Sequence, residues 1–314
     1  MPNTPNNWGT DLYKFVGKTF TVTSEQFRQK RNIFNLFGEI TTTSAFYDLA
    51  CGGDFGELPA FDGSKNNINP YRGFRTILAP KEYAGAYDIH YKQWINDMTG
   101  EVKKAGKQLG TAAQMKIWLE TLRLFSRAYS SSYTGGDGKA WAATDHPNAS
   151  KGTTAGARTY EADSTKGTYS NLITTELSEA GITEAKKQAS RFVTPAANPW
   201  LGNYDTLLVS PELEWKAYGL VKAMNTPDSA ENAANTVANM KVVVVGGGNE
   251  GFSEDQWAIC DSSLMKDLCA IVYNTKPEVS EGTNWSKYIK TMVGYASFDV
   301  AWGDARQIIF SNPA

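Results

Sequence analysis

The chain has 314 residues and a net charge of −2, with 41% hydrophobic and 20% charged residues. This composition excludes an intrinsically disordered chain, because it contains enough apolar side chains to build a large core. Since there is no basic excess, it also excludes a protein whose main work is to neutralise nucleic-acid phosphates. The N-terminal sequence lacks the basic start and apolar run of a signal peptide, and the apolar runs are far too short to span a membrane. We therefore expect a protein made in a reducing cytoplasm and without a membrane partner.

The three cysteines argue against both a disulfide framework and a zinc site. Cys51, Cys260 and Cys269 are odd in number, and none belongs to a C-x-x-C pair. We predict that they are small buried apolar residues.

The N-terminal region is predicted to contain an arm and a short helix. Residues 1–10 are polar and include two prolines, which is typical of a loose arm. Residues 20–37 predict an amphipathic helix that begins near Thr23 or Ser24. Its apolar positions are Phe27, Ile33, Phe34 and Phe37.

Residues 38–98 have a different character. Glycine- and proline-containing pieces interrupt segments rich in Thr, Tyr and Phe, and the alternation in AYDIHYKQW predicts a strand. The segment is poor in core residues, and an isolated two-stranded ribbon is only marginally stable in water. Two interpretations stay open: an excursion that lies on another subunit, or a sheet excursion packed on its own domain.

The clearest predicted element is a long helix from about residue 99 to residue 133. Apolar residues recur at spacings of three and four, at Val102, Ala105, Leu109, Ala112, Trp118, Leu122, Phe125 and Tyr129. Gly106 and Gly110 are predicted to weaken it locally, and SSSYTGGDG ends it.

The second half of the chain predicts alternating strands and helices. Residues 134–170 are dense in Gly, Ser and Thr and predict a loop, whereas residues 174–192 predict a helix. A second helix is predicted to begin at Pro211, because proline is favoured in the first turn. Strands are predicted at TLLV, MKVVVV, QWAIC, CAIVY, YIKTMVGYASFDVAW and RQIIF.

The cluster from Gly246 to Gly251 follows a strand and satisfies G-x-G-x-x-G, the spacing of a dinucleotide-binding turn. The sequence after it, FSEDQWAIC, predicts a strand rather than a helix, and no βαβ unit surrounds it. This context favours a hairpin or loop over a nucleotide site.

The remaining ionisable residues form no recognisable catalytic pattern. His90 and His146 are the only histidines, and neither accompanies a G-x-S-x-G or Cys–His arrangement. The pair Glu254–Asp255 is as typical of a surface as of a general acid and base. We therefore predict no catalytic residue, no cofactor-binding residue, no cofactor and no metal site.

The segment DGKAWAATDHP, from Asp137 to Pro147, resembles the D-G…H-P segment of tailed-phage major capsid proteins, especially the Mu-type head subunits. Trp141 and Ala142 stand where a Leu-Phe pair is expected in that branch. The order of landmarks after it, LLVSPELE and then QWAI, is also similar to the family.

This resemblance implies an α+β fold with five parts along the chain. They are an N-terminal arm (1–37), an extended loop (38–98), a peripheral domain with a spine helix (99–192), an axial domain (193–270) and a return to the peripheral domain (271–314). The implied function is that of a major capsid protein whose pentamers and hexamers form an icosahedral virion shell.

The implied partners are other copies of the chain, a scaffold protein, a portal protein and a double-stranded DNA genome bound without sequence specificity. Two alternatives remain at this point. One is a related cargo shell or another virion protein, and the other is a nucleotide-dependent oxidoreductase that uses the Gly246–Gly251 cluster.

Overall fold

A computed structural model describes most of the chain, namely residues 5–50, 58, 60–61, 63, 73–95, 100–148, 167–195, 198–222, 237–284 and 286–313. The helical elements are α1 (Pro5–Gln29), the 3-10 helix η1 (Asn32–Leu36), α2 (Tyr91–Ile95), α3 (Glu101–Ser126), α4 (Glu179–Ala189), α5 (Glu214–Lys222) and α6 (Ser262–Leu268). The strands are β1 (Gly38–Thr41), β2 (Tyr47–Ala50), β3 (Arg75–Leu78), β4 (Lys81–His90), β5 (His146–Pro147), β6 (Thr168–Tyr169), β7 (Leu172–Ile173), β8 (Thr206–Val209), β9 (Lys241–Val244), β10 (Gly246–Gly247), β11 (Glu250–Gly251), β12 (Trp257–Cys260), β13 (Cys269–Asn284), β14 (Ile289–Trp302) and β15 (Ile308–Ser311).

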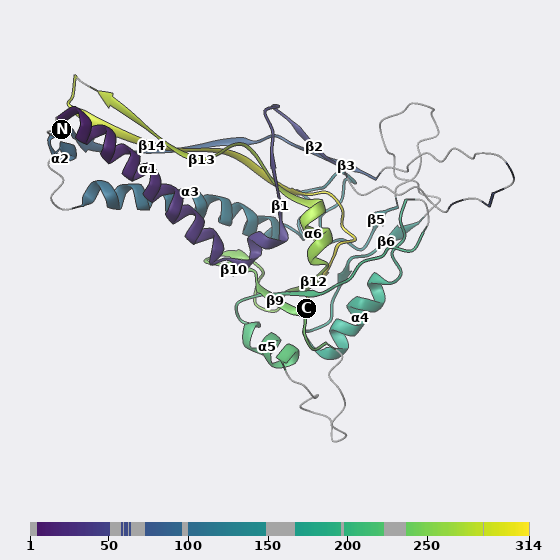
Figure 1. The fold of residues 1–314 in the computed structure, drawn as a ribbon. Coiled ribbons are helices and arrows are strands. Elements are labelled where there is room, and N and C mark those ends of the chain that lie inside the picture. Colours follow the sequence, from purple (N-terminus) through teal and green to yellow (C-terminus); the bar gives the residue numbers. More distant parts are fainter. Residues whose placement is uncertain are drawn as a thin grey trace.

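A long four-stranded sheet forms one part of the molecule, in the order β1-β13-β14-β4. β1 runs parallel to β13, whereas β13, β14 and β4 are mutually antiparallel. β13 and β14 make a hairpin of 16 and 14 residues, which runs with β4, α1 and α3 toward the end of the molecule where α2 lies (Figure 1). Helices α1 and α3 lie along one face of this sheet.

The N-terminal region is one long helix, which corrects two sequence-based predictions. Residues 5–10, expected in a loose arm, belong to α1, and the helix expected over 20–37 ends at Gln29 and is followed by η1. The physical reason lies in tertiary packing, because α1 runs against α3. Gly106 and Gly110 sit at the crossing, and a methyl group at Gly110 would lie 2.7 Å from the carbonyl oxygen of Phe20. The two glycines therefore permit a close helix crossing.

A five-stranded sheet, β7-β15-β12-β8-β9, forms the second part of the molecule. Its strands alternate their side chains between two apolar layers. Leu207, Val209 and Ile259 face α4 and α5, whereas Leu208 and Phe310 face η1 and the second half of α3. Both faces of this sheet are consequently buried.

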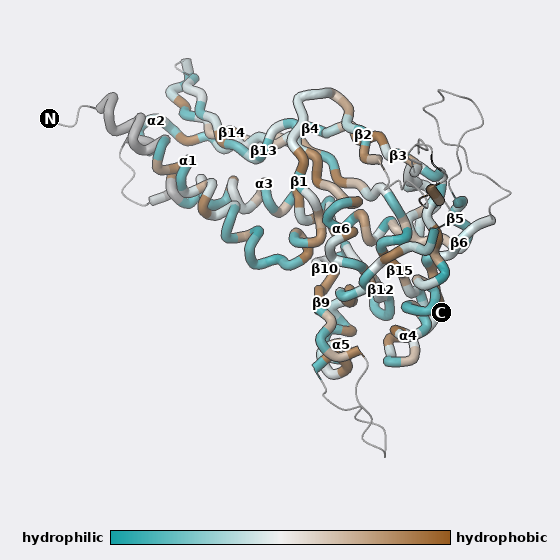
Figure 2. The backbone as a smooth tube through the Cα atoms, turned by 45° about the vertical axis from the view of Figure 1, so that its right-hand side comes forward, coloured by the Kyte–Doolittle hydropathy of each residue, from teal (hydrophilic) through white to brown (hydrophobic). Residues whose placement is uncertain are grey.

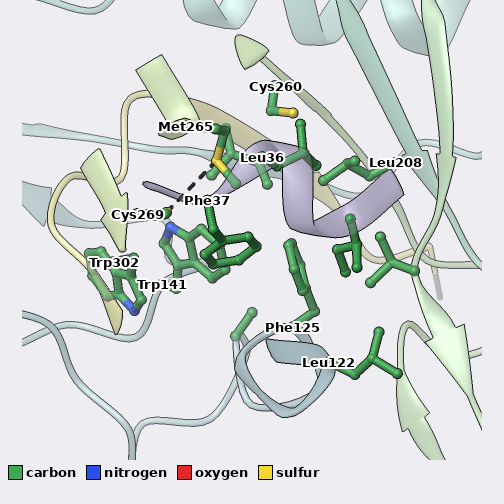
Figure 3. Close-up of a cluster of buried hydrophobic side chains, with 14 of the residues drawn as sticks. Leu36, Phe37, Leu122, Phe125, Trp141, Leu208, Cys260, Met265, Cys269 and Trp302 are labelled. Atoms are coloured by element: carbon green, nitrogen blue, oxygen red, sulfur yellow. Dashed lines mark hydrogen bonds between the residues drawn. The ribbon is translucent and has the colours of Figure 1, made fainter. Parts of the chain in front are cut away.

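The main core lies where the two sheets meet. Phe37 packs on Phe125, Phe125 on Trp141 and Trp141 on Trp302 (Figure 3). Hydrophobic colours gather around β1 and β9, whereas much of the outer β13–β14 hairpin is hydrophilic (Figure 2). The fold therefore has a dense junction and a thinner extension.

The two sheets do not divide along the chain as expected. β15 lies within 271–314, the part expected to return to the peripheral sheet, but it pairs with β12 and β7 in the five-stranded sheet. Likewise β1 and β4, within 38–98, are edge strands of the long sheet and not parts of a separate loop. In the described part of that segment, β2 and β3 pair only with each other. Backbone pairing between distant strands, which local sequence does not report, causes both differences.

Most of the predicted elements are confirmed, with different ends. The long helix is observed as Glu101–Ser126, and the helix expected over 174–192 begins at Glu179 because the Ser178 hydroxyl accepts a hydrogen bond from the Gly181 amide. The helix expected from Pro211 begins at Glu214. Helix α6 was missed, although Asp261 caps it through the Ser263 and Leu264 amides.

Candidate functional site: the assembly surfaces

The glycine cluster forms a hairpin, as its context predicted. β10 pairs with β11, and the chain then continues through a turn into β12, so no helix N-terminus follows the glycines to receive a phosphate. A Cβ at Gly247 would lie 2.2 Å from the Trp118 ring, and one at Gly246 would lie 2.6 Å from Pro211. The glycines therefore serve close packing, which contradicts the oxidoreductase interpretation.

An ion pair links the β10–β11 hairpin to α3. Arg123 Nε donates to Glu250 Oε1 at 2.8 Å, and Arg123 also bonds Glu120 on the same helix. These two carboxylates raise the pKa of the Arg123 guanidinium further. The hairpin is thus held as part of the junction between the two sheets.

The other candidate residues do not come together. His90 ends β4 with an exposed side chain, and its Nδ1 accepts from the Lys92 amide at 3.3 Å. Glu254 and Asp255 are exposed in a turn. Within the described ranges, no group of three His, Cys, Asp or Glu side chains could hold a metal ion, and no helix is long and apolar enough to cross a membrane.

The cysteines that the structure describes are buried and free. Cys260 and Cys269 lie in the main core, where burial raises the pKa of both thiols well above the ordinary value. The Cys269 sulfur lies 3.9 Å from the Met265 sulfur (Figure 3). Both cysteines are therefore the small core residues that were predicted, whereas Cys51 lies outside the described residues.

The D-G…H-P segment builds a buried polar network around His146, which is fully buried. Its Nδ1 lies 2.6 Å from Asp137 Oδ2 and its Nε2 lies 3.1 Å from Asn171 Oδ1. Asp145, the neighbour in sequence, instead pairs with Lys139 at the surface. Sequence order alone did not identify the true partners.

Asn171 connects this network to the backbone of three neighbouring segments. Its Nδ2 donates to the carbonyls of Trp141 and Ala305, so its Oδ1 must accept, from the Ala143 amide and from His146 Nε2. The other ring nitrogen, Nδ1, is in contact with the Asp137 carboxylate. The network is therefore a fully satisfied structural brace rather than a catalytic triad, because both imidazole nitrogens are occupied within the protein.

A second buried pair lies beside this network in the turn between β14 and β15. Arg306 Nε donates to Asp304 Oδ1 at 3.0 Å, and another of its nitrogens donates to the Val193 carbonyl at 2.7 Å. The guanidinium also stacks over Trp200, 4.4 Å from the ring centroid. This turn ties the end of the long sheet to the five-stranded sheet.

The surfaces left exposed include several large apolar side chains. Four of them lie on the segment that contains β2 and β3, at Phe46, Leu58, Phe61 and Ile77. Two more lie at Leu201 and Trp215, next to the five-stranded sheet. Exposed aromatic and aliphatic side chains on projecting segments are typical of surfaces that other chains cover.

Comparison with known families identifies the chain. Residues 74–309 match the model of a family described as phage capsid protein. The chain belongs to the phage capsid protein family. No curated protein matches it. As a capsid protein it is a component of the virion shell, and its family is one of structural proteins.

The capsid of one cyanophage supports the fold. The capsid of the cyanophage P-SCSP1u is 10% identical, with a TM-score of 0.52 over 89% of this chain and 86% of that chain. The capsid of Ralstonia phage GP4 is 13% identical, with a TM-score of 0.49 over 89% and 87% of the two chains. The family match and the likeness to the cyanophage capsid confirm the predicted tailed-phage capsid fold. The assignment to the Mu-type branch stays a prediction.

Proposed function

We propose that this capsid protein assembles into pentamers and hexamers that close an icosahedral shell around double-stranded DNA. The observation that carries the proposal is the capsid family match across residues 74–309, which includes α3 and most strands of both sheets. The net charge of −2 suits a container that encloses DNA without binding it strongly. Many weak contacts that close together would supply the stability of the shell.

Each part of the chain has a proposed role in that shell. The long sheet with α1 and α3 forms the peripheral domain, and the five-stranded sheet with α4 and α5 forms the axial domain around the symmetry axes. The segment that carries β2 and β3 is the extended loop that reaches a neighbouring subunit. Synthesis in the host cytoplasm, a separate scaffold and a portal protein complete the proposal, and no enzymatic step is part of it.

Electron microscopy of the purified protein, with and without the scaffold protein of its phage, tests the proposal. We expect closed particles of uniform diameter, built from pentamers and hexamers. A protein that stays monomeric under every assembly condition, including the presence of scaffold, would contradict it. Sedimentation velocity measured on the same samples separates true monomers from open, incomplete shells.

A further inference from the structure

The edge strand β4 leaves a row of backbone groups unpaired. It is the last strand of the long sheet, and in the described part of the chain it pairs with β14 alone. The Tyr91 amide donates to the Tyr288 carbonyl in the same register, so the odd-numbered residues of β4 form the hydrogen bonds with β14. The even-numbered residues therefore present their amides and carbonyls at the free edge: Glu82, Ala84, Ala86, Asp88 and His90.

This edge lacks the protection found at the other free edge of the long sheet. Beyond Tyr273, β13 has no described partner on the side of β1, but it carries Pro277 and two register shifts, which hinder pairing with a further strand. β4 contains no proline and keeps one register with β14 along its whole length, and its five central residues are uncharged. A regular, unprotected edge is a template for pairing with another chain.

A groove lies beside the middle of this edge. Gly85 stands directly opposite Gly294 of β14, and a Cβ at Gly85 would meet nothing within 4 Å. The groove measures about 410 Å³, is open to solvent, and has Leu109 and Ala112 of α3 and Glu82 of β4 among its lining residues. An engineered apolar cavity of about 150 Å³ binds benzene, so this groove has room for an aromatic ring. Glycine inside a strand often marks a place where another backbone approaches closely.

Tyr87 lies on the same face of β4 as the groove. Side chains alternate along a strand, and Ile89 is buried with Val16 of α1 and Val102 of α3, so the odd-numbered residues face the helices. Tyr87 is 41% exposed and is not among the residues that line the groove in its own chain. On an added strand, however, a tyrosine opposite Gly85 would lie over the groove. An aromatic residue placed across from an edge glycine stabilises strand pairing.

Antiparallel pairing of β4 with β4 of a second copy brings Tyr87 and the groove together. A twofold axis at Ala86 makes Ala86 its own partner and places Tyr87 of each copy opposite Gly85 of the other. That pair is of the non-hydrogen-bonded kind, in which side chains lie closest. The contact is isologous, because each copy supplies one ring and receives one. The axis is perpendicular to the sheet, so the helices of both copies lie on one side, as neighbouring subunits of a closed shell require.

The remaining pairs of this register are also complementary. Tyr83 lies opposite Ile89 on the helix side, and a pair of an aromatic and a β-branched side chain stabilises a sheet. Glu82 lies opposite His90 on the other side. His90 Nδ1 accepts from a backbone amide of its own chain at 3.3 Å, so Nε2 is the nitrogen that can donate to the Glu82 carboxylate of the second copy. A twofold axis one residue earlier would oppose Glu82 to Asp88, and like charges disfavour that register.

We infer that the free edge of β4 binds β4 of a second copy of the chain, antiparallel about a twofold axis at Ala86, with Tyr87 of each copy in the groove beside Gly85 of the other. This inference rests on the proposed shell function and adds to it a contact between neighbouring rings of subunits. The paired β4 strands join the two long sheets into one continuous sheet.

An oxidative crosslink tests the register. The two copies of Ala86 face each other across the axis with about 5.5 Å between their Cα atoms, which suits a disulfide. Shells of Ala86→Cys, in a Cys51→Ser background, should therefore give disulfide-linked dimers on mild oxidation. Ala84→Cys is the matched control, because Ala84 is also exposed on the same face but lies roughly 13 Å along the strand from its counterpart. It should give at least about tenfold fewer dimers. Equal dimer yields from the two variants, or Ala86→Cys shells without dimers, would overturn the inference.

Assembly of two Tyr87 variants tests the groove contact. Tyr87→Ala should leave the thermal unfolding of the unassembled subunit nearly unchanged but lower the yield of closed shells at least about tenfold. Tyr87→Phe keeps the ring and should assemble like the natural protein. Equal shell yields for Tyr87→Ala and the natural protein, or an equal loss in both variants, would overturn the inference and leave the shell function intact. Failure of the natural protein itself to assemble would count against the shell function.

Discussion

The two sheets of this capsid protein differ in how many of their residues are buried within a single chain. Every residue of β8, β12 and β15 is buried, because layers of side chains cover both faces of the five-stranded sheet. In the long sheet, only Ile89 of the ten residues of β4 is buried, and much of the outer half of β13 is exposed. The five-stranded sheet completes its core within one chain, whereas the long sheet leaves exposed strands and a groove that is open to solvent.

This difference assigns stability and assembly to different regions. A substitution within the five-stranded sheet acts on folding, because it removes contacts that already exist in a single chain. A substitution on the outer part of the long sheet acts mainly on surfaces that a single chain leaves to solvent. The predictions below compare matched changes in the two regions, from the largest expected effect to the smallest.

The largest effect is expected at Phe310, which is fully buried in β15 and packs against Trp141, Tyr129 and Phe252. Phe310→Ala should lower the free energy of unfolding of the unassembled subunit by about 3–5 kcal/mol, because it leaves a cavity in a dense core. Tyr87→Ala, at a half-exposed position of β4, should change the free energy of unfolding by no more than about 0.5–1 kcal/mol. Urea denaturation of both variants measures the difference. Equal losses would mean that the long sheet is as self-contained as the other sheet.

The second effect concerns the buried Asp304–Arg306 pair at the turn that joins the two sheets. Asp304→Asn should destabilise the subunit by about 3–5 kcal/mol at pH 7, because it leaves the Arg306 guanidinium buried without its carboxylate. Glu281→Gln, which breaks a partly exposed pair with Lys290 on the long sheet, should cost no more than about 1 kcal/mol.

The pH dependence of the Asp304 effect has a defined sign. Burial alone would raise the pKa of the Asp304 carboxyl, but the charge and hydrogen bonds of Arg306 outweigh burial and hold that pKa below its usual range. The stability it contributes is therefore complete above the unfolded-state value of about 3.9 and is lost as pH falls through the lower folded-state value. The difference in the free energy of unfolding between the natural protein and Asp304→Asn should stay constant from pH 7 to pH 5. It should shrink below about pH 4. A difference in free energy of unfolding that instead shrinks as pH rises would contradict a lowered pKa for Asp304.

The smallest effect compares two helix glycines. Gly110→Ala should destabilise the subunit by about 1–3 kcal/mol, because the added methyl group collides with the backbone of α1 at Phe20. Gly219→Ala in α5 is the matched control, since nothing lies within 4 Å of its added carbon, and it should stabilise by about 0.5–1 kcal/mol. Thermal unfolding monitored by circular dichroism measures both. A stabilising Gly110→Ala would mean that α1 does not pack closely on α3.

Part of the site could be predicted from the sequence, and part could not. The spacing and context of the Gly246–Gly251 cluster were sufficient to predict a hairpin, because the apolar strand that follows it in sequence is incompatible with a phosphate-binding helix. The partners of His146 were not predictable, since Asp137 and Asn171 lie 9 and 25 residues away in the chain. The Gly85–Gly294 pair is even more distant in sequence, and only strand register places the two glycines opposite each other.

The sequence by itself determined the local elements: the helical period of α3, the apolar strands β8, β9, β12 and β15, and the absence of a recognisable catalytic pattern. These features depend on the alternation of apolar and polar side chains over a few neighbouring residues. The sequence contains that pattern directly. Tertiary structure alone decided that α1 packs along α3, that β15 joins the five-stranded sheet, and that a groove stays open above two glycines. Each of these depends on a contact between distant segments, where backbone hydrogen bonds and the absence of a side chain, rather than local preference, determine the structure.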